Sequence, residues 1–569
     1  MAATAPPRWR HADDGDLVVV EDVKELKQAV HDEMEAIGCG YYQRRVVTIL
    51  GCGNVADAVE ILAIGYILTV YEDTEGKISP WESSFLTAAV FAGMLAGGFT
   101  GGVLGDIYGR KPVLLTTLAI NALAAFLSAF STSIYWLIFF RTIAGLGVGG
   151  VVSSLFALCL EHVPVSARGR YVTILCSFWM VGSVLTAGTA WLMLGNDVHG
   201  HRILDISWRW FAAVVGLPSF GCLVFTAWYI PESPHFLASQ GKVQAVSEVI
   251  QFIHAVNGST RQPRFQFVDP DVDVSLQKAK LHGSTGRTND HAPSGRGSVA
   301  RAMFDADRMK GLGRLFQAPY LLGTALLMFC AFCLSFGSYG LSTWITKLFQ
   351  SVGLSNPFAN AFLFAGANLP GNLVSLYLVD LVGRKQLLSG AFFSSALCAL
   401  LFAFNVEGSA AVVVIVSCLF NACTTAAWNA FGVLSAENFP LEVRTTGISL
   451  VNCSGRIGAI TAQFVNGLLM GDPPHVAALL LVASTVMVSG GLAARQVKPP
   501  EESDPAAMQQ RRASIQLQRA EGERHRDRER ELERECGVLK GEDDDDLDLD
   551  GSWSETQRCL SSSSERSSC

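Results

Sequence analysis

Two acidic residues lie inside a long apolar stretch, where an ionisable side chain can carry a proton. Asp57 and Glu60 are three positions apart within residues 46–70, so on a helix they would share one face. A charge in the middle of a membrane costs at least about 2.5 kcal/mol, and these carboxylates should therefore face protein or water. We favour the interpretation that one of them binds a proton and couples it to the movement of a solute. The alternative is a purely structural pairing with Arg141 or Arg456.

Other patterns that could support chemistry are weaker. Cys330 and Cys333 form a C-x-x-C pair, but it lies in an apolar stretch with no second pair or histidine nearby, which favours packing over a metal or redox site. Residues 46–56 contain the dinucleotide-binding pattern G-x-G-x-x-A, yet the apolar run continues to Val70 instead of ending as a strand. We therefore expect no metal, no cofactor and no enzymatic activity.

The elements that position these residues are apolar spans. Hydrophobic residues make up 50% of the 569 positions and charged residues 17%, and the mean hydropathy is +0.32. About twelve runs are long enough to cross the membrane. The net charge is −8, and many of the acidic residues lie at 542–550. This charge gives no support to nucleic-acid binding. The composition predicts an all-α membrane protein with about twelve transmembrane helices.

Two charged patterns occur twice and indicate an internal duplication. D-x-x-G-R-K stands at 106–111 and 380–385, and E-x-x-P-x-x-x-R stands at 161–168 and 437–444. The offsets of 274 (380 − 106) and 276 (437 − 161) predict two six-helix halves. We interpret these turns as gates that pair in one conformation and release in another; alternatively, they only fix the topology. The gate residues are Asp106, Gly109, Arg110, Lys111, Glu161, Arg168, Asp380, Gly383, Arg384, Lys385, Glu437 and Arg444.

A stripe of glycines precedes the first of these turns. Gly93, Gly97, Gly101 and Gly105 recur at every fourth position and would form one side-chain-free face of a helix. Such a face lets a second helix pack closely, as small residues do in membrane proteins.

The chain is expected to consist of a membrane region in two halves with polar segments around it. The predicted parts are an N-terminal segment (1–45), the first half (46–230), a linker (231–318), the second half (319–494) and a tail (495–569). Basic residues gather in short loops on one side, which places the charged turns, the linker and both termini in the cytoplasm.

The polar segments have some predictable structure of their own. Apolar stripes predict short helices at 23–37 and at 243–253. The Ser- and Gly-rich residues 257–298 and the tail are expected to be disordered. The sequence R-R-A-S ending at Ser514 resembles a kinase site, where a phosphate would add charge to the tail.

The pattern G-x-x-x-D-x-x-G-R-K at 102–111 resembles that of the major facilitator superfamily. Other stretches are similar to the branch containing synaptic vesicle glycoprotein 2 and its shorter transporter-like relatives, namely ADAVEILAIG from 56, CSFWMVGS from 176, PESPHFL from 231, LSFGSYGLSTW from 334 and AAWNAFGVLSAENFP from 426. Only residues 350–357 separate spans seven and eight, where the vesicle glycoproteins carry a long luminal domain. The chain is thus more similar to the shorter relatives, and the resemblance implies the major facilitator fold.

Aromatic and polar residues in several spans are candidates for a central solute pocket. They are Trp179, Tyr339, Trp344, Trp428, Asn429 and Arg456. Aromatic side chains with a few polar groups suit a ligand with both apolar and hydrogen-bonding surface, and such sites lie between the halves at mid-membrane. The resemblance places Trp179 and Trp428 in the ligand pocket of the vesicle glycoprotein. Without it, packing or anchoring at the membrane interface would be the ordinary role of a Trp.

These features favour a secondary active transporter of a small organic ion or sugar that works by alternating access and is coupled to protons. Its expected partners are the solute, protons and the lipid bilayer, and we expect a monomer in the plasma membrane or a vesicle membrane. The alternative is a membrane protein that keeps this fold without transporting and binds partners through its termini and linker. Asp57, Glu60 and the two charged turns favour the transporter, and the acidic tail favours the alternative.

Overall fold

The computed structural model describes residues 23–196, 202–204, 206–258, 313, 315–317, 320–439 and 444–497. In this part of the chain, eleven helices are long and apolar enough to cross a membrane. They confirm the predicted all-α membrane protein. The expected disorder in the linker lies almost entirely outside the described residues, and the tail with Ser514 lies beyond Val497.

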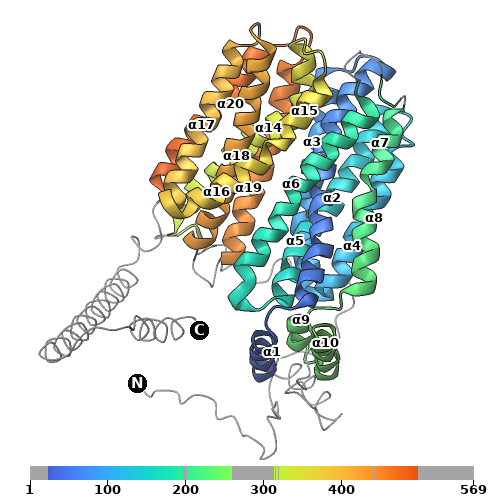
Figure 1. Cartoon of the computed structure of the whole chain (residues 1–569), viewed down its shortest axis with the longest axis vertical. Helices are drawn as coiled ribbons and strands as arrows, with labels where there is room; N and C mark the ends of the chain where they lie inside the picture. The colour runs from blue at the N-terminus through green and yellow to red at the C-terminus, as the bar shows by residue number, and fades with distance from the viewer. Residues whose placement is uncertain are drawn as a thin grey trace, which may run out of the picture. The chain divides into compact units, whose positions relative to one another are not determined.

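The membrane helices form two halves, which stand side by side in Figure 1. The first half contains α2 (Tyr41–Glu75), α3 (Pro80–Tyr108), α4 (Arg110–Ser128), α5 (Ile134–His162), α6 (Arg168–Leu194), α7 (Trp208–Val215) and α8 (Leu217–Tyr229). The second contains α14 (Leu321–Ser351), α15 (Pro357–Gly366), α16 (Asn368–Val382), α17 (Arg384–Phe404), α18 (Ala410–Asn438), α19 (Arg444–Leu469) and α20 (Val476–Gln496).

Helix α19 belongs to the second half but is less apolar than the eleven helices that could cross a membrane, and it is not one of them. Its 26 residues include Arg456, Gln463 and Asn466, which lower its hydropathy. It packs against α14 in its own half and against α3 in the other half. A polar helix is stable here because protein, and not lipid, surrounds its polar face.

Two of the apolar runs, span six at about 208–230 and span eight at about 358–379, are each divided into two helices. Span six breaks at Gly216 between α7 and α8, and span eight breaks at Ala367 between α15 and α16. Pro218 and Pro370 follow these breaks. A proline has no N–H to donate and its ring clashes with the carbonyl four residues earlier, so each break follows from the sequence.

The glycine stripe packs as predicted. Gly93, Gly97 and Gly101 of α3 lie against the backbone of α5, including its Leu146 and Gly150. A Cβ at Gly101 would lie 2.6 Å from the Gly150 Cα, closer than any side chain allows. These two helices of the first half therefore touch backbone to backbone.

The two ends of the bundle have different cores. We call the end with the turns at Gly109 and Gly383 the motif end, and the opposite end, where α2 joins α3 and α14 joins α15, the distal end. At the distal end one apolar cluster joins both halves and includes Tyr66, Leu68, Leu86, Trp208, Leu341, Trp344, Phe349, Phe364, Phe402 and Leu480. At the motif end each half has a separate cluster.

Short helices cover the first half at the motif end (Figure 1). They are α1 (Val23–Ile37), α9 (Pro234–Ser239) and α10 (Val243–Val256), so the predicted helices in the N-terminal segment and the linker are confirmed. Glu33 of α1 and His254 of α10 form a buried pair at 2.9 Å. The Glu35 carboxylate accepts a hydrogen bond from the Val165 N–H at 2.9 Å, which ties α1 to the loop before α6.

Candidate functional site

The central feature of the site is an acidic and a basic side chain contributed by different halves. Asp57 lies on α2 and Arg456 on α19, and Arg456 is a positive charge close to the Asp57 carboxylate. Asp57 is only 6% exposed. Its Oδ1 atom and Nη1 of Arg456 are buried and have no hydrogen-bond partner among the described residues. Buried polar atoms are normally paired, so Asp57 and Arg456 both retain hydrogen-bonding capacity, as do Glu60 through Oε2 and Arg141 through Nε.

Aromatic side chains from both halves surround this pair. Trp179 of α6 hydrogen-bonds to Asp57, and Tyr339 of α14 lies 5.7 Å from the Arg456 guanidinium. The Tyr339 ring also packs against the rings of Phe91 on α3 and Trp428 on α18, with 5.3 and 5.8 Å between the ring centres. The pair therefore stands in an aromatic setting that can hold a planar or apolar group beside two charges.

Glu60 has a different environment from Asp57, although both lie on α2. Its Oε1 accepts a hydrogen bond from Nη1 of Arg141 on α5 at 2.6 Å, and both side chains are almost fully buried. Arg141 also donates to the Ser128 hydroxyl at 2.8 Å. All three residues belong to the first half. The structural pairing weighed for these acids thus describes Glu60, whereas the partner of Asp57 lies across the interface.

The remaining pocket candidates lie around this centre in different settings. Trp344 is fully buried in the shared distal core and donates its ring N–H to Gln463 at 2.8 Å. Trp428 is partly buried and donates to Ser338 at 3.1 Å. Asn429 turns toward α16, where it donates to Asn372 at 2.7 Å. Trp428 thus reaches the charged pair only through Tyr339, which lies between them, and Asn429 is satisfied within its own half.

A small cavity lies beside the predicted Trp179, and its other lining residues were not predicted from the sequence. It has room for about one water molecule, and its lining includes Trp179, Tyr66, Ser183, Asn368 and Asn421. Asn368 donates to Ser183 of the other half at 3.1 Å. A signal was present, since Asn368 directly follows the break in span eight, and broken helices often form transporter sites.

The two charged turns have the same local geometry. Gly109 and Gly383 have φ angles of 109° and 90°, a region in which residues with a Cβ are strained. In the first half the turn is also capped by Glu232, whose carboxylate accepts from the N–H groups of Arg110 and Lys111 at 3.1 and 3.2 Å. An anion at a helix N-terminus is favoured by the helix dipole. Glu232 was not among the predicted site residues.

The gate residues form their ion pairs within each half. Arg110 contacts Asp106 at 2.9 Å and Glu161 at 3.1 Å, and Arg384 contacts Glu437 at 3.4 Å. Three other basic residues of the motifs donate to backbone carbonyls near helix ends. Arg168 donates to Leu160 at 3.0 Å, Arg444 to Phe439 at 3.2 Å and Lys111 to Ala227 at 3.2 Å. Lys385 lies in the first turn of α17. The side chain of Asp380 is outside the described part of the structure.

Metal chemistry has no support in the described residues. No group of three or more His, Cys, Asp and Glu side chains among them is arranged to hold an ion. The Cys330 thiol contacts the Gly490 carbonyl at 3.7 Å and the Cys333 thiol contacts Ser489 at 3.6 Å. Both cysteines pack between α14 and α20.

Comparison with known proteins identifies the family. The family described as sugar (and other) transporters matches residues 53–492. The chain belongs to this family. This family is part of the major facilitator superfamily, whose members are membrane transporters and not enzymes.

The chain is similar in sequence to several named proteins and in fold to a solved sugar transporter. It is 28% identical over 472 residues to organic cation/carnitine transporter 7 of Arabidopsis thaliana, covering 79% of this chain and 90% of that protein. It is 26% identical to human synaptic vesicle glycoprotein 2C, covering 79% and 78%, and 26% identical to the niacin transporter NiaP of Acinetobacter baylyi, covering 76% and 88%. The inward-open xylose transporter XylE of E. coli shares its fold, with a TM-score of 0.59, 16% identity and coverage of 80% and 96%.

Proposed function

We propose that this protein is a proton-coupled secondary transporter of a small organic anion. The observation that carries the proposal is the pair of Asp57 and Arg456, which come from different halves and lie among aromatic side chains of both halves. We place the motif end and the termini in the cytoplasm because the basic residues of the short loops gather at that end. The membrane is the plasma membrane or that of a vesicle.

The proposed mechanism follows from charge balance. While Asp57 is ionised, it neutralises Arg456 across the interface. When Asp57 takes up a proton its charge is lost, and Arg456 is left to bind the carboxylate of a solute. Trp179, Tyr339 and Trp428 would pack against the rest of that solute. Because one proton enters with one negative charge, transport of a monoanion would move no net charge.

Asp57 suits the coupling role better than Glu60. Glu60 and Arg141 belong to one half and remain together when the halves move, so the state of Glu60 does not depend on the conformation. The distance between Asp57 and Arg456 changes whenever the halves rock, which links protonation to movement. The names of the relatives support small organic solutes in general, since they include niacin and carnitine.

The test is thermal unfolding of the detergent-purified protein with niacin, benzoate, carnitine and xylose at pH 5.5 and 7.5. A ligand at about a hundred times its Kd stabilises by about 2.7 kcal/mol. We expect a higher unfolding midpoint with niacin or benzoate, and a larger rise at pH 5.5, where Asp57 is more often protonated. A rise in the midpoint with xylose alone would overturn the proposal that the solute is an anion. A rise with carnitine alone would indicate a zwitterionic solute that binds while Asp57 stays charged.

Trp428→Ala is the matched site variant. It should lose most of the ligand-induced rise while its ligand-free midpoint stays near that of the wild type, because Trp428 is only partly buried. An unchanged ligand response would remove Trp428 from the pocket. If no solute changes the unfolding midpoint of well-folded protein, the result favours the alternative of a membrane protein that does not transport.

A further inference from the structure

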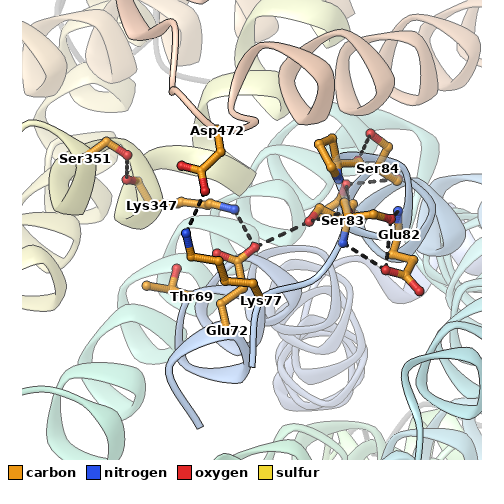
Figure 2. Close-up of polar contacts among 12 residues, drawn as sticks. Thr69, Glu72, Lys77, Glu82, Ser83, Ser84, Lys347, Ser351 and Asp472 are labelled. Atoms are coloured by element: carbon orange, nitrogen blue, oxygen red, sulfur yellow. Dashed lines mark hydrogen bonds and ion pairs between the residues drawn. The ribbon is translucent and has the colours of Figure 1, made fainter. Parts of the chain in front are cut away.

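Four charged residues at the distal end join the two halves through ion pairs (Figure 2). Glu72, near the end of α2, contacts Lys347 of α14 with 2.6 Å between Oε1 and Nζ. Lys77, in the loop between α2 and α3, contacts Asp472, in the loop between α19 and α20, at 2.6 Å. Each pair takes one residue from each half. None of these four residues belongs to the repeated patterns of the sequence.

The two pairs differ in their exposure to water. The side chains of Lys347 and Glu72 are 14% and 24% exposed, the Lys347 ammonium lies 5.3 Å from the Trp344 ring centre, and Ser83 donates to Glu72 at 3.5 Å. The side chains of Lys77 and Asp472 are 86% and 77% exposed. Water and salt screen the exposed pair, so the pair of Glu72 and Lys347 is the stronger one.

In the exposed pair, each residue affects the pKa of the other. Hydrogen bonding to Asp472 and its negative charge raise the pKa of Lys77. The same contact with Lys77 lowers the pKa of Asp472. Each group thus favours the charged form of the other, in keeping with the 2.6 Å contact between the two loops.

The location of these pairs distinguishes them from the other ion pairs between described residues. The pairs of Arg110, Arg384 and Arg141 each lie within one half. Arg209 and Glu75 also form a pair at 2.7 Å near the distal end, but both belong to the first half. A contact within one half is unaffected when the halves move apart, whereas the two cross-half contacts have to break before the distal end can open.

We propose that Glu72, Lys347, Lys77 and Asp472 form the distal gate, which holds the halves together while the motif end is open and releases in every cycle. This rests on the proposed function only in requiring that the halves move. Ion pairs at a water boundary suit such a gate because water replaces each lost partner, so the gate can open and close reversibly. The apolar core beneath supplies shape complementarity, and the pairs bias the equilibrium.

The experiment is hydrogen–deuterium exchange of the full chain, read by mass spectrometry. The variants are Glu72→Gln, Lys347→Gln and the charge swap Glu72→Lys with Lys347→Glu. Arg209→Gln is the matched control, since it removes an ion pair of similar length (2.7 against 2.6 Å) near the same end that lies within one half. Size-exclusion chromatography confirms folding, and Asp472→Asn, at a largely exposed site, replaces any variant that fails to fold.

We expect Glu72→Gln and Lys347→Gln to raise exchange roughly threefold at the distal ends of α2 and α14 and to lower it at the motif ends of α3 and α18. The charge swap should restore the wild-type pattern, and Arg209→Gln should leave it unchanged. Faster exchange at both ends would mean local loosening and would overturn the gate, as would a pattern equal to that of the wild type. Exchange is measured without solute, so the gate can hold even where the proposed anion fails to bind.

Discussion

The distal end and the motif end differ in what their contacts join. At the distal end, Trp344 and Phe402 of the second half share one apolar core with Tyr66 and Leu86 of the first, and two ion pairs cross the interface. At the motif end the cores and the ion pairs of the repeated charged patterns stay within each half. Contacts within a half should therefore hold the fold, and contacts between halves should select which end is closed.

The strongest way to break this comparison is to remove a buried charge partner inside one half. Glu60→Gln leaves Arg141 buried and without its carboxylate, and such a loss costs about 3–5 kcal/mol. Chemical unfolding of the purified variant should show this decrease in unfolding free energy. Asp57→Asn, whose partner lies on the other half, should lower it by less than about 1 kcal/mol. Equal losses for both variants would contradict the distinction.

Two glycines offer a steric version of the same test. A methyl group at Gly97 would collide with the Leu146 carbonyl in the same half, and one at Gly65 would collide with the Thr343 carbonyl in the other half. Gly97→Ala should reduce stability by about 1–3 kcal/mol through overpacking. Gly65→Ala should keep most of the stability and instead increase hydrogen exchange at the distal end, because the halves can separate to relieve the collision. A comparable loss of stability in both variants would count against this division.

The sequence was informative where structure depends on local spacing. The duplicated turns, the glycine stripe and the stripe of α10 were predicted because helical periodicity and a positive-φ glycine are local properties. The sequence could not decide whether Arg141 or Arg456 pairs with Asp57, since both choices satisfy the spacing on α2. The distal gate was missed because Glu72 and Lys347 are 275 residues apart and share no pattern.

Acid should weaken the motif end before the distal end. Burial, with Arg168 and nearby His31 and His162, lowers the pKa of His235 on α9 to about 4. His235 is neutral in the fold, while in the unfolded chain it takes up a proton below about pH 6.5, so stability is lost as the pH falls from 6.5 toward 4. Between pH 7.5 and 5 the loss attributable to His235 should be about 1–2 kcal/mol.

His235→Gln, which cannot titrate, is the control for this loss. The wild type should lose more thermal stability than the variant between pH 7.5 and 5. The Lys77 and Asp472 pair should persist over this range, because the pKa of Asp472 lies below its ordinary value. An identical pH dependence in both proteins would remove His235 from the account.

The smallest effect concerns the two copies of the charged turn. Arg110 is 18% exposed and contacts two carboxylates, whereas Arg384 is 43% exposed and contacts Glu437 at 3.4 Å. Arg110→Ala should therefore cost about 1 kcal/mol and Arg384→Ala a few tenths of that. Unfolding in parallel at low and high salt checks both values. A larger loss of unfolding free energy for Arg384→Ala than for Arg110→Ala would show that the more buried ion pairs of Arg110 are not the more stabilising ones.

The most direct test of coupling across the interface is uptake driven by a pH gradient. Proteoliposomes with an alkaline interior would be supplied with niacin or benzoate, whichever raises the unfolding midpoint. We predict that the wild type accumulates the anion above its external concentration without generating a membrane potential, and that Asp57→Asn binds the anion but no longer accumulates it. Equal accumulation by Asp57→Asn, or no accumulation of a bound anion by the wild type, would contradict the account.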